Sequence, residues 1–186
     1  MFKDRTKRMF AAELERMLAE MPLAKVRVKD LCECCDAQRQ AFYYHFQDKY
    51  DVVAWIFNQD FERGLEDAAE PTYEAQTAAA LRRMWERRSF YRTAFADRSQ
   101  NSIERHIQDF DVQMSEEYVL RHTGAKKLTD QQLFEIKSHS YGSIGCTVEW
   151  LWGELAATPE QLAAWECKRM PAFMLDALNA AARGWR

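Results

Sequence analysis

The stretch CDAQRQAFYYHFQDKYD, residues 35–51, decides how this chain folds. Phe42 and Phe46 stand four positions apart, which puts both rings on one face of a short helix. The pair Asp36-Ala37 breaks the helical pattern that comes before it. A segment that only packed into a core would not need the polar tips of its neighbours, and a solvated surface would not need the rings.

Two further helices are indicated ahead of this stretch. Val28, Leu31 and Cys35 form the inner face of a short helix that ends at the Asp36-Ala37 break. A longer helix comes first, and Pro22 ends it. Its apolar face consists of Phe10, Leu14, Met17 and Met21. Two short helices joined by a turn and braced by a longer one form a helix-turn-helix.

The remainder of the chain also shows helical spacing. The 186 residues include only six glycines and four prolines, and we find no strand-like alternation and no internal repeat. Asp48 is expected to cap the helix that follows it, and Thr129 and Thr158 are expected to cap the two last helices. The sequence therefore predicts an all-α protein of about nine helices, with a three-helix helix-turn-helix domain in residues 1–50 and a helical bundle domain in residues 51–186.

Charge separates the same two segments. The chain as a whole has a formal net charge of −3. Residues 1–50 hold ten Lys/Arg and eight Asp/Glu, net +2, whereas residues 51–186 hold sixteen and twenty-one, net −5. The N-terminal segment therefore tolerates an anionic partner.

The second helix of a helix-turn-helix enters the major groove of DNA, where its first turn meets base edges. Arg39 and Gln40 occupy that turn, and these side chains can pair bidentately with guanine and adenine. Tyr43, Tyr44 and His45 can donate to phosphate oxygens. Lys49 follows at the start of the next helix, where the helix dipole attracts phosphate. The stretch is thus expected to bind double-stranded DNA.

Catalytic motifs are not found, so the chain is predicted not to be an enzyme and to need no cofactor. Gly142-Ser143-Ile144-Gly145 lacks the spacing of a nucleophile elbow, and the histidines lack metal-ligand spacing. Cys32, Cys34 and Cys35 are crowded together, but neither a second cysteine cluster nor paired histidines lie near, and no metal is expected. Small buried helix residues are the simpler interpretation; a redox or metal sensor is the alternative.

The location of the protein is expected to be cytoplasmic. The longest uncharged run, residues 138–148, is far shorter than the ~18–20 residues that a membrane span needs. The N-terminal residues lack an apolar signal core, and the five cysteines make an odd count, against a disulfide framework.

The penultimate helix, about residues 130–155, carries two stripes. One is the usual apolar stripe, and the other contains two glycines that permit close approach of another backbone. This second stripe, a candidate homodimer interface, consists of Ser138, Gly142, Gly145, Glu149 and Trp152. The alternative is a central helix of a monomer.

The segment VKDLCECCDAQRQAFYYHFQDKYDVVAWIF, residues 28–57, resembles the DNA-binding region of TetR/AcrR-type transcriptional regulators. The run Phe42-Tyr43-Tyr44-His45-Phe46 followed by Asp48-Lys49 carries the resemblance. The tail from Tyr141 to Pro171 is similar to the C-terminal region of a subgroup that includes dihydroxyacetone-kinase operon regulators.

The resemblance implies a homodimer with an N-terminal DNA-binding domain and a C-terminal effector-binding domain. It implies that Tyr43, His45 and Lys49 contact phosphates. It also implies that bases are read by the first turn, in which Gln38 starts the helix and is followed by Arg39, Gln40 and Ala41. Cys34 and Cys35 fall on small-residue positions of the motif, in line with packing.

The chain departs from the family pattern at four positions. Asp36, which is expected to tolerate a left-handed backbone at some cost, replaces the turn glycine, and Ala37 replaces the usual valine. Gln38 replaces the Ser or Thr that caps the recognition helix, and Ala41 deletes a phosphate-contacting hydroxyl. These changes bear on operator sequence and affinity and not on the fold.

An effector pocket is expected among the middle helices, and its lining suggests an apolar or aromatic ligand with His139 or Tyr141 as a polar handle. Ordinary core packing is the alternative for the aromatic residues. The candidate ligand-binding residues are Phe57, Phe61, Trp85, Phe110, Met114, His139 and Tyr141.

The sequence as a whole predicts a homodimeric, ligand-responsive transcriptional regulator that binds a palindromic operator. Repression is the family default, and a small-molecule effector would release or alter DNA binding. The alternative is a helical dimeric protein-interaction module, a co-regulator without DNA binding of its own.

Overall fold

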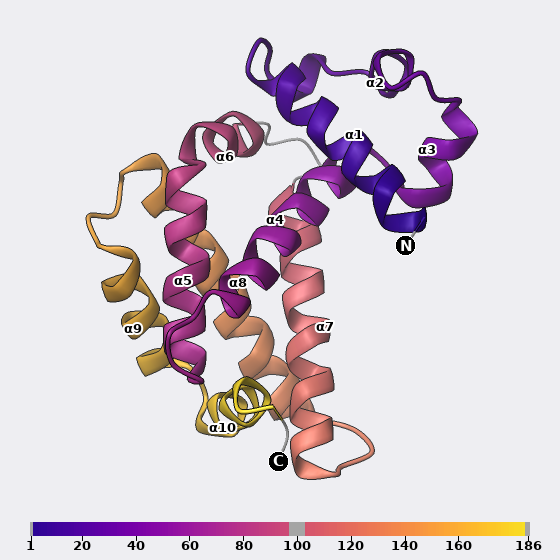
Figure 1. Ribbon diagram of the computed structural model, residues 1–186. Helices are drawn as coiled ribbons and strands as arrows, with labels where there is room; N and C mark the ends of the chain where they lie inside the picture. Colours follow the sequence, from indigo (N-terminus) through magenta and orange to yellow (C-terminus); the bar gives the residue numbers. More distant parts are fainter. Residues whose placement is uncertain (1, 97–102, 185–186) are drawn as a thin grey trace. The chain divides into compact units, whose positions relative to one another are not determined.

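The structure is a computed structural model that describes residues 2–96 and 103–184 (Figure 1). Its elements, in chain order, are α1 (Phe2–Leu18), the 3₁₀ helix η1 (Leu23–Lys25), α2 (Val28–Cys34), α3 (Arg39–His45), α4 (Lys49–Glu66), α5 (Tyr73–Glu86), α6 (Arg88–Phe95), α7 (Ile103–Thr123), α8 (Asp130–Trp152), α9 (Pro159–Arg169) and α10 (Ala172–Ala182). The described residues form helices and no strands, so the predicted all-α class is confirmed.

Ten α-helices are present in the described residues where about nine were expected, and the C-terminal end accounts for part of the difference. The sequence pattern suggested one last helix after Thr158. In the structure, α9 ends at Arg169, and Met170 is extended with φ −69° and ψ 139°. Pro171 then precedes α10, and a proline disfavours helical backbone in the residue before it.

Packing divides the chain into two compact units. The first comprises Met1–Gln59 with Arg87–His106, and the second comprises Asp60–Glu86 with Ile107–Arg186. The expected domain boundary at residue 50 lies in the second position of α4, whereas the packing division falls nine residues later in that helix. Helix α6 packs in the first unit although α5 belongs to the second, an assignment that the linear charge pattern did not indicate.

The first unit is organised around three phenylalanines. The Phe10 ring on α1 meets the Phe42 ring on α3 edge-on, with centroids 5.2 Å apart, and meets Phe46 at 6.5 Å. All three rings are buried, as the four-residue spacing of Phe42 and Phe46 predicted. Aromatic pairs in this geometry are favourable beyond the area that they bury. The short helix α3 is thereby held against α1 (Figure 1).

Helix α6 completes the first unit. Arg87, just before it, forms an ion pair with Glu15 of α1 at 2.6 Å. The Tyr91 ring is fully buried and meets Phe57 of α4 edge-on at 6.2 Å.

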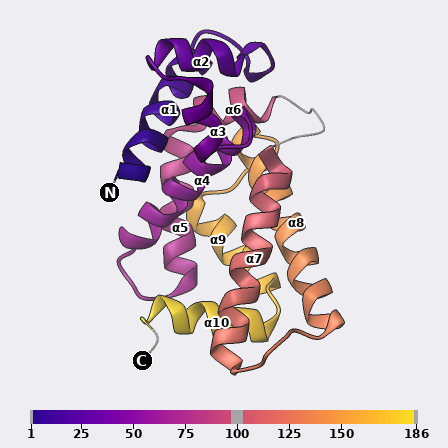
Figure 2. The same cartoon turned by 90° about the vertical axis from the view of Figure 1, so that its right-hand side faces the viewer.

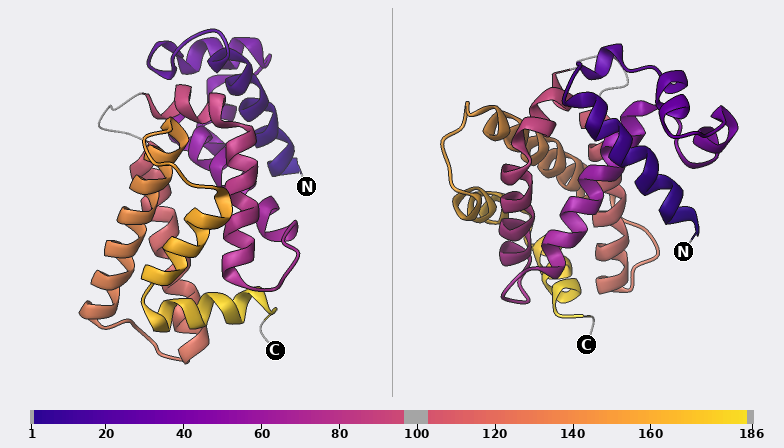
Figure 3. Two further views of the ribbon diagram at one scale, coloured as in Figure 1. Left: turned by 90° about the vertical axis from the view of Figure 1, so that its left-hand side faces the viewer. Right: turned by 45° about the horizontal axis from the view of Figure 1, so that its top comes forward.

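The second unit is a helical bundle in which α5 packs along α9, and α7 and α8 run side by side (Figures 2 and 3). Trp85 of α5 lies against the buried Trp150 of α8, with ring centroids 4.8 Å apart. A separate apolar cluster joins α7, α8 and α10. Its buried members are Val112, Val119, Ile136, Met170, Met174, Ala177 and Leu178.

Two predicted helix caps are confirmed in this unit. The Thr129 side chain accepts a hydrogen bond from the Gln132 backbone N–H, and the Gln132 side chain accepts one from the Thr129 backbone N–H. Thr158 and Gln161 make the same reciprocal pair at the start of α9. Each capping box satisfies two N–H groups that the helix cannot satisfy itself. No helix in the described ranges has the length and apolar character that crossing a membrane requires.

The turn between α2 and α3 uses a left-handed backbone at Asp36, with φ 48°. The Ala37 backbone N–H donates to the Cys32 carbonyl at 2.9 Å, which closes the end of α2. Asp36 stands where the family pattern has glycine, so the expectation that Asp would adopt this conformation is confirmed.

We expect Asp36→Gly to raise the free energy of unfolding by about 1 kcal/mol, because glycine adopts a left-handed backbone without steric cost. Asp36→Ala should lower it, since alanine lacks the polar side chain that helps aspartate tolerate this region. Chemical denaturation of both variants measures the difference. Equal stabilities of the two variants would contradict the strain at Asp36.

Candidate nucleic-acid interface

Helix α3 presents a polar face opposite its buried rings. Tyr43 and Tyr44 are 58% and 68% exposed, and Arg39 and Gln40, each one helical turn earlier, are also exposed. Residues four apart share a helix face, so Arg39 lines up with Tyr43 and Gln40 with Tyr44. Because Phe42 lies on the opposite side, burying it turns the four polar side chains outward. The structure thus brings together the four predicted contact residues at the centre of the motif.

The other predicted contacts on α3 are less uniform. Gln38 is exposed, but its side chain makes no capping hydrogen bond, in agreement with its expected weakness as a cap. Ala41 and His45 are half-buried. The His45 ring meets the Tyr44 ring edge-on at 4.9 Å. Packing of the phenylalanines, and not a side-chain cap, therefore fixes the start of this helix.

The Lys49 side chain forms hydrogen bonds within the first unit. Its ammonium donates hydrogen bonds to the backbone carbonyls of Leu23 at 2.7 Å, Ala24 at 3.1 Å and Val26 at 3.1 Å. Sequence reasoning gave Lys49 a phosphate contact on the strength of its position at the start of a helix. The pattern held no sign of these carbonyl partners, which lie more than twenty residues away in the chain.

The start of α4 is capped by carboxylates. Asp48 accepts hydrogen bonds from the backbone N–H groups of Tyr50 at 2.8 Å and Asp51 at 2.9 Å. Asp51 in turn accepts one from the Gln47 N–H at 3.0 Å. The predicted cap at Asp48 is confirmed, and its negative charge already complements the helix dipole.

Two cations near the start of α2 went unnoticed in the sequence pattern. Arg27 and Lys29 are exposed, and each pairs with an acid on its own helix, Arg27 with Asp30 at 2.8 Å and Lys29 with Glu33 at 3.4 Å. Such exposed pairs contribute little to stability, so both cations can exchange partners. The alternation of basic residues in KVRVK was the signal that would have found them.

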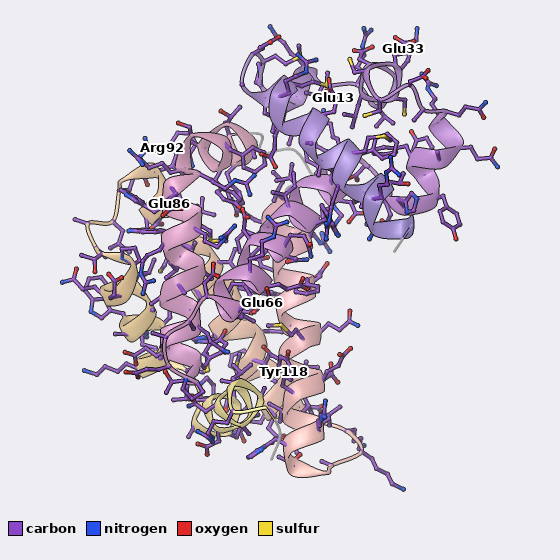
Figure 4. All side chains as sticks on the ribbon, in the orientation of Figure 1. Glu13, Glu33, Glu66, Glu86, Arg92 and Tyr118 are labelled. Atoms are coloured by element: carbon purple, nitrogen blue, oxygen red, sulfur yellow. The ribbon has the colours of Figure 1, made fainter. Side chains whose placement is uncertain are left out.

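Cys32 of α2 and Cys35, the residue after it, have raised thiol pKa values. Burial raises the pKa of Cys32, and burial together with the charge of Glu13, labelled in Figure 4, raises the pKa of Cys35 to about 11. A thiol with a raised pKa holds its proton at neutral pH and is a poor nucleophile. Within the described residues, no group of three or more His, Cys, Asp or Glu is arranged to hold a metal ion.

The predicted ligand-binding residues are scattered. Phe61 and Met114 line one cavity, of about 110 Å³, with Tyr73 and with Tyr118, labelled in Figure 4. Phe57 belongs to the first unit, Trp85 stacks on Trp150, and Phe110 and Tyr141 are exposed. His139 lines a groove of about 780 Å³ between α8 and α9, where burial lowers its pKa. Helical spacing predicts which face a ring occupies and not which neighbour it meets.

Half-buried acids in the second unit were missed altogether. Burial raises the pKa of Glu166 to about 8, although the Thr147 hydroxyl donates to its carboxyl at 3.1 Å. Burial also raises the pKa of Asp111. Burial and then the Asp111 charge raise the pKa of Tyr73. Single polar residues inside the apolar stripes of α7 and α9 were the available signal.

The second stripe of α8 faces outward. Ser138, Gly142 and Trp152 are exposed, as is Glu149, while Gly145 is half-buried. A Cβ atom added at Gly142 or Gly145 would meet no atom within 4 Å, so neither glycine is required by packing within the chain. Phe134 and Tyr141 of the same helix are 70% and 45% exposed. The stripe is therefore an uncovered surface that mixes aromatic rings with glycines.

Glu166 predicts a pH dependence of stability. Its pKa rises from an ordinary value of 4.5 to about 8 in the folded protein, so between these values the unfolded chain releases a proton that the folded chain keeps. Stability contributed by this group is complete below pH 4.5 and is lost as the pH rises toward 8. Glu166→Gln should abolish that loss, so its stability relative to the unmodified protein should be greater at pH 8 than at pH 5.

Urea unfolding at both pH values measures the effect. Glu154→Gln is the matched control, because Glu154 is exposed, and its stability should follow that of the unmodified protein. A parallel pH dependence for Glu166→Gln would mean that the Glu166 carboxyl is hydrated in the folded state.

Comparison with known proteins identifies the family to which the chain belongs. Residues 72–165, half of the chain, match the TetR-type family model described as a transcriptional regulator C-terminal region. The HTH-type dhaKLM operon transcriptional activator DhaS of Lactococcus lactis subsp. lactis (strain IL1403) is 24% identical over 91 residues, which are 48% of this chain and 49% of that protein. The chain thus spans about half the length of this curated relative in the match.

A solved structure, that of the dihydroxyacetone kinase operon activator DhaS, is similar along almost the whole chain. It covers 96% of both chains with a TM-score of 0.50 and 18% sequence identity, and at that identity the likeness shows the fold alone. The family match covers most of the helical bundle, and the helix-turn-helix precedes it in the sequence. The chain therefore belongs to the TetR-type transcriptional regulators.

Proposed function

We propose that this regulator binds a palindromic DNA operator as a homodimer, with α3 of each subunit in the major groove. The observation that carries the proposal is the polar face of α3, on which Arg39, Gln40, Tyr43 and Tyr44 stand outward over a buried Phe42. A helix with this arrangement fits the width of the major groove. Two such helices would occupy half-sites roughly 34–36 Å apart, or a multiple of that distance.

Roles on α3 follow from side-chain chemistry. Arg39 and Gln40, in the first turn, are suited to guanine and adenine edges, with Gln38 and Ala41 beside them. The hydroxyls of Tyr43 and Tyr44 can donate to phosphates at the groove walls, and so can the ring of His45. Base contacts specify a sequence, whereas phosphate contacts orient the protein on any duplex.

The outward stripe of α8 is our candidate for the dimer interface. Ser138, Gly142, Gly145, Glu149 and Trp152 form it, and the exposed rings of Phe134 and Tyr141 extend it. Glycines that no internal neighbour requires are explained by the close approach of a second helix.

An effector would bind in the second unit. The cavity that Phe61 and Met114 line is one candidate, and its apolar walls favour an apolar or aromatic molecule. Binding would shift a pre-existing equilibrium between DNA-binding and released forms.

The direction of regulation is a separate question from DNA binding. Repression is the default that the family resemblance implies, whereas the relative from Lactococcus lactis is named an activator. We favour activation on that ground. A promoter–reporter assay with and without the regulator decides between them, since an activator raises transcription and a repressor lowers it.

Arg39→Ala should weaken binding to the operator and relax base preference at one position of each half-site. Tyr44→Phe should weaken binding to all sequences alike, because only a phosphate contact is lost. Gel-shift titrations against operator variants, with promoter fragments flanking the gene, measure both. A discriminating base pair is expected to be worth roughly 1–3 kcal/mol.

Arg121→Ala, an exposed position on α7 in the second unit, is the control and should bind as the unmodified protein does. If Arg39→Ala loses the same binding free energy with every operator variant, Arg39 does not contact a base. Absence of any shift at low salt would favour the alternative function, a dimeric protein-interaction module without DNA binding.

Gly142→Leu should weaken the dimer without loss of helix content, because leucine has room within the subunit but would separate two helices packed at this stripe. Sedimentation velocity over a range of concentrations measures the change. Lys126→Leu, in the exposed segment before α8, is the control. An unchanged dimer in the Gly142 variant would place the interface elsewhere.

A further inference from the structure

We propose that Lys49 does not contact phosphate but is a positioning residue. Its side chain joins the backbone just before α2 to the start of α4, and we call this link the tie. The proposal deepens the DNA-binding function proposed above. It concerns how the recognition helix is held and not which partner it meets.

The geometry of the Lys49 ammonium is the first observation. Three backbone carbonyls surround it, those of Leu23, Ala24 and Val26, at 2.7, 3.1 and 3.1 Å. They belong to η1 and the residue after it, just before α2 begins at Val28. Lys49 itself is the first residue of α4, directly beyond α3. One side chain therefore joins the two ends of the segment that contains α2 and α3.

The donor count excludes a simultaneous phosphate contact. An ammonium group has three N–H donors, and each carbonyl takes one of them. A phosphate oxygen would have to replace one of these carbonyls as the acceptor. The hydrogen bonds to Leu23 and Val26 are half-buried and charge-assisted, so replacing them is unfavourable. The Lys49 ammonium also lies over the Tyr50 ring, 5.3 Å from the ring centroid.

Two backbone N–H groups at the start of α4 are also used within the protein. The Asp48 carboxylate accepts from the N–H groups of Tyr50 and Asp51, so these donors are taken. A phosphate there would also meet the negative charge of Asp48. Both features that favoured a phosphate at the start of this helix, the lysine and the helix dipole, are thus used within the protein.

The tie stabilises a segment whose two short helices have few local stabilising interactions. Helices α2 and α3 have seven residues each, too few to be stable alone. Neither has a side-chain cap at its start, and the turn between them bends through a left-handed Asp36. Local determinants of their orientation are few, so a bond that closes the segment at its base restricts how α3 can tilt.

Two substitutions separate a tie from a phosphate contact. Lys49→Met keeps the apolar stem and removes the ammonium. Lys49→Arg keeps the charge and binds phosphate at least as well as lysine does, but its planar guanidinium cannot direct three donors from one atom to three converging carbonyls. If Lys49 contacts phosphate, Lys49→Arg should therefore keep DNA affinity. If Lys49 forms the tie, Lys49→Arg should lose affinity as Lys49→Met does.

The full-length protein is titrated with operator DNA at several salt concentrations, at a temperature where circular dichroism shows each variant folded. We expect both variants to bind about tenfold or more weakly at every salt concentration, with the slope of log K against log salt unchanged. Lys126→Met, with an exposed lysine in the second unit, is the control and should leave affinity and slope unchanged.

Two results would overturn the proposal. A slope reduced by about 0.9 in Lys49→Met, together with full affinity in Lys49→Arg, would assign Lys49 to a phosphate. Unchanged affinity in the folded variants, with only a lower melting temperature, would make Lys49 a stabilising residue without a positioning role.

Hydrogen exchange tests the tie apart from DNA. In the unmodified protein, the amides of η1 and of the start of α4 should exchange together, and both variants should expose them without affecting the second unit. This measurement stands even if no DNA binds, so failure of the tie and failure of the DNA-binding proposal are distinguishable.

Discussion

Burial of Phe42 and Phe46 against Phe10 is the constraint on which the first unit depends. The rings meet edge-on within one core, and α3 has no side-chain cap that would fix its start independently. Because a helix turns by a fixed angle per residue, placing Phe42 inward, with Phe46 anchoring the extended residue after the helix, determines the direction of the other side chains of α3. The outward direction of Arg39 and Tyr43 is thus a consequence of core packing, before any nucleic acid is considered.

Local and periodic features of the structure were predictable from the sequence. The inward pair Phe42 and Phe46, the caps at Thr129 and Thr158 and the left-handed Asp36 each depend on neighbours within a few positions. Features that join distant segments were not. The carbonyls that bind Lys49 leave no trace in the sequence, because every residue has a carbonyl and its availability depends on the path of the backbone.

Half-buried acids in the second unit also depend on contacts between distant segments. Glu166 and Asp111 lie on different helices, and the charge of Asp111 contributes to the raised pKa of Glu166. Keeping two carboxyls away from water costs stability unless they hold their protons or find partners. Their positions within apolar stripes were a signal in the sequence, but periodicity does not show how far neighbouring helices shield each carboxyl from water.

The aromatic packing has an optical consequence. Trp55 is the sole tryptophan in the sequence of the first unit, and its ring lies 6.3 Å from the Phe46 ring, at the base of α3. In the second unit, Trp85 and Trp150 lie 4.8 Å apart, close enough for their electronic transitions to couple. The near-ultraviolet circular dichroism of that pair reports its packing, and a variant that keeps Trp55 alone gives fluorescence from the first unit. The two parts of the chain can thus be observed separately without an added label.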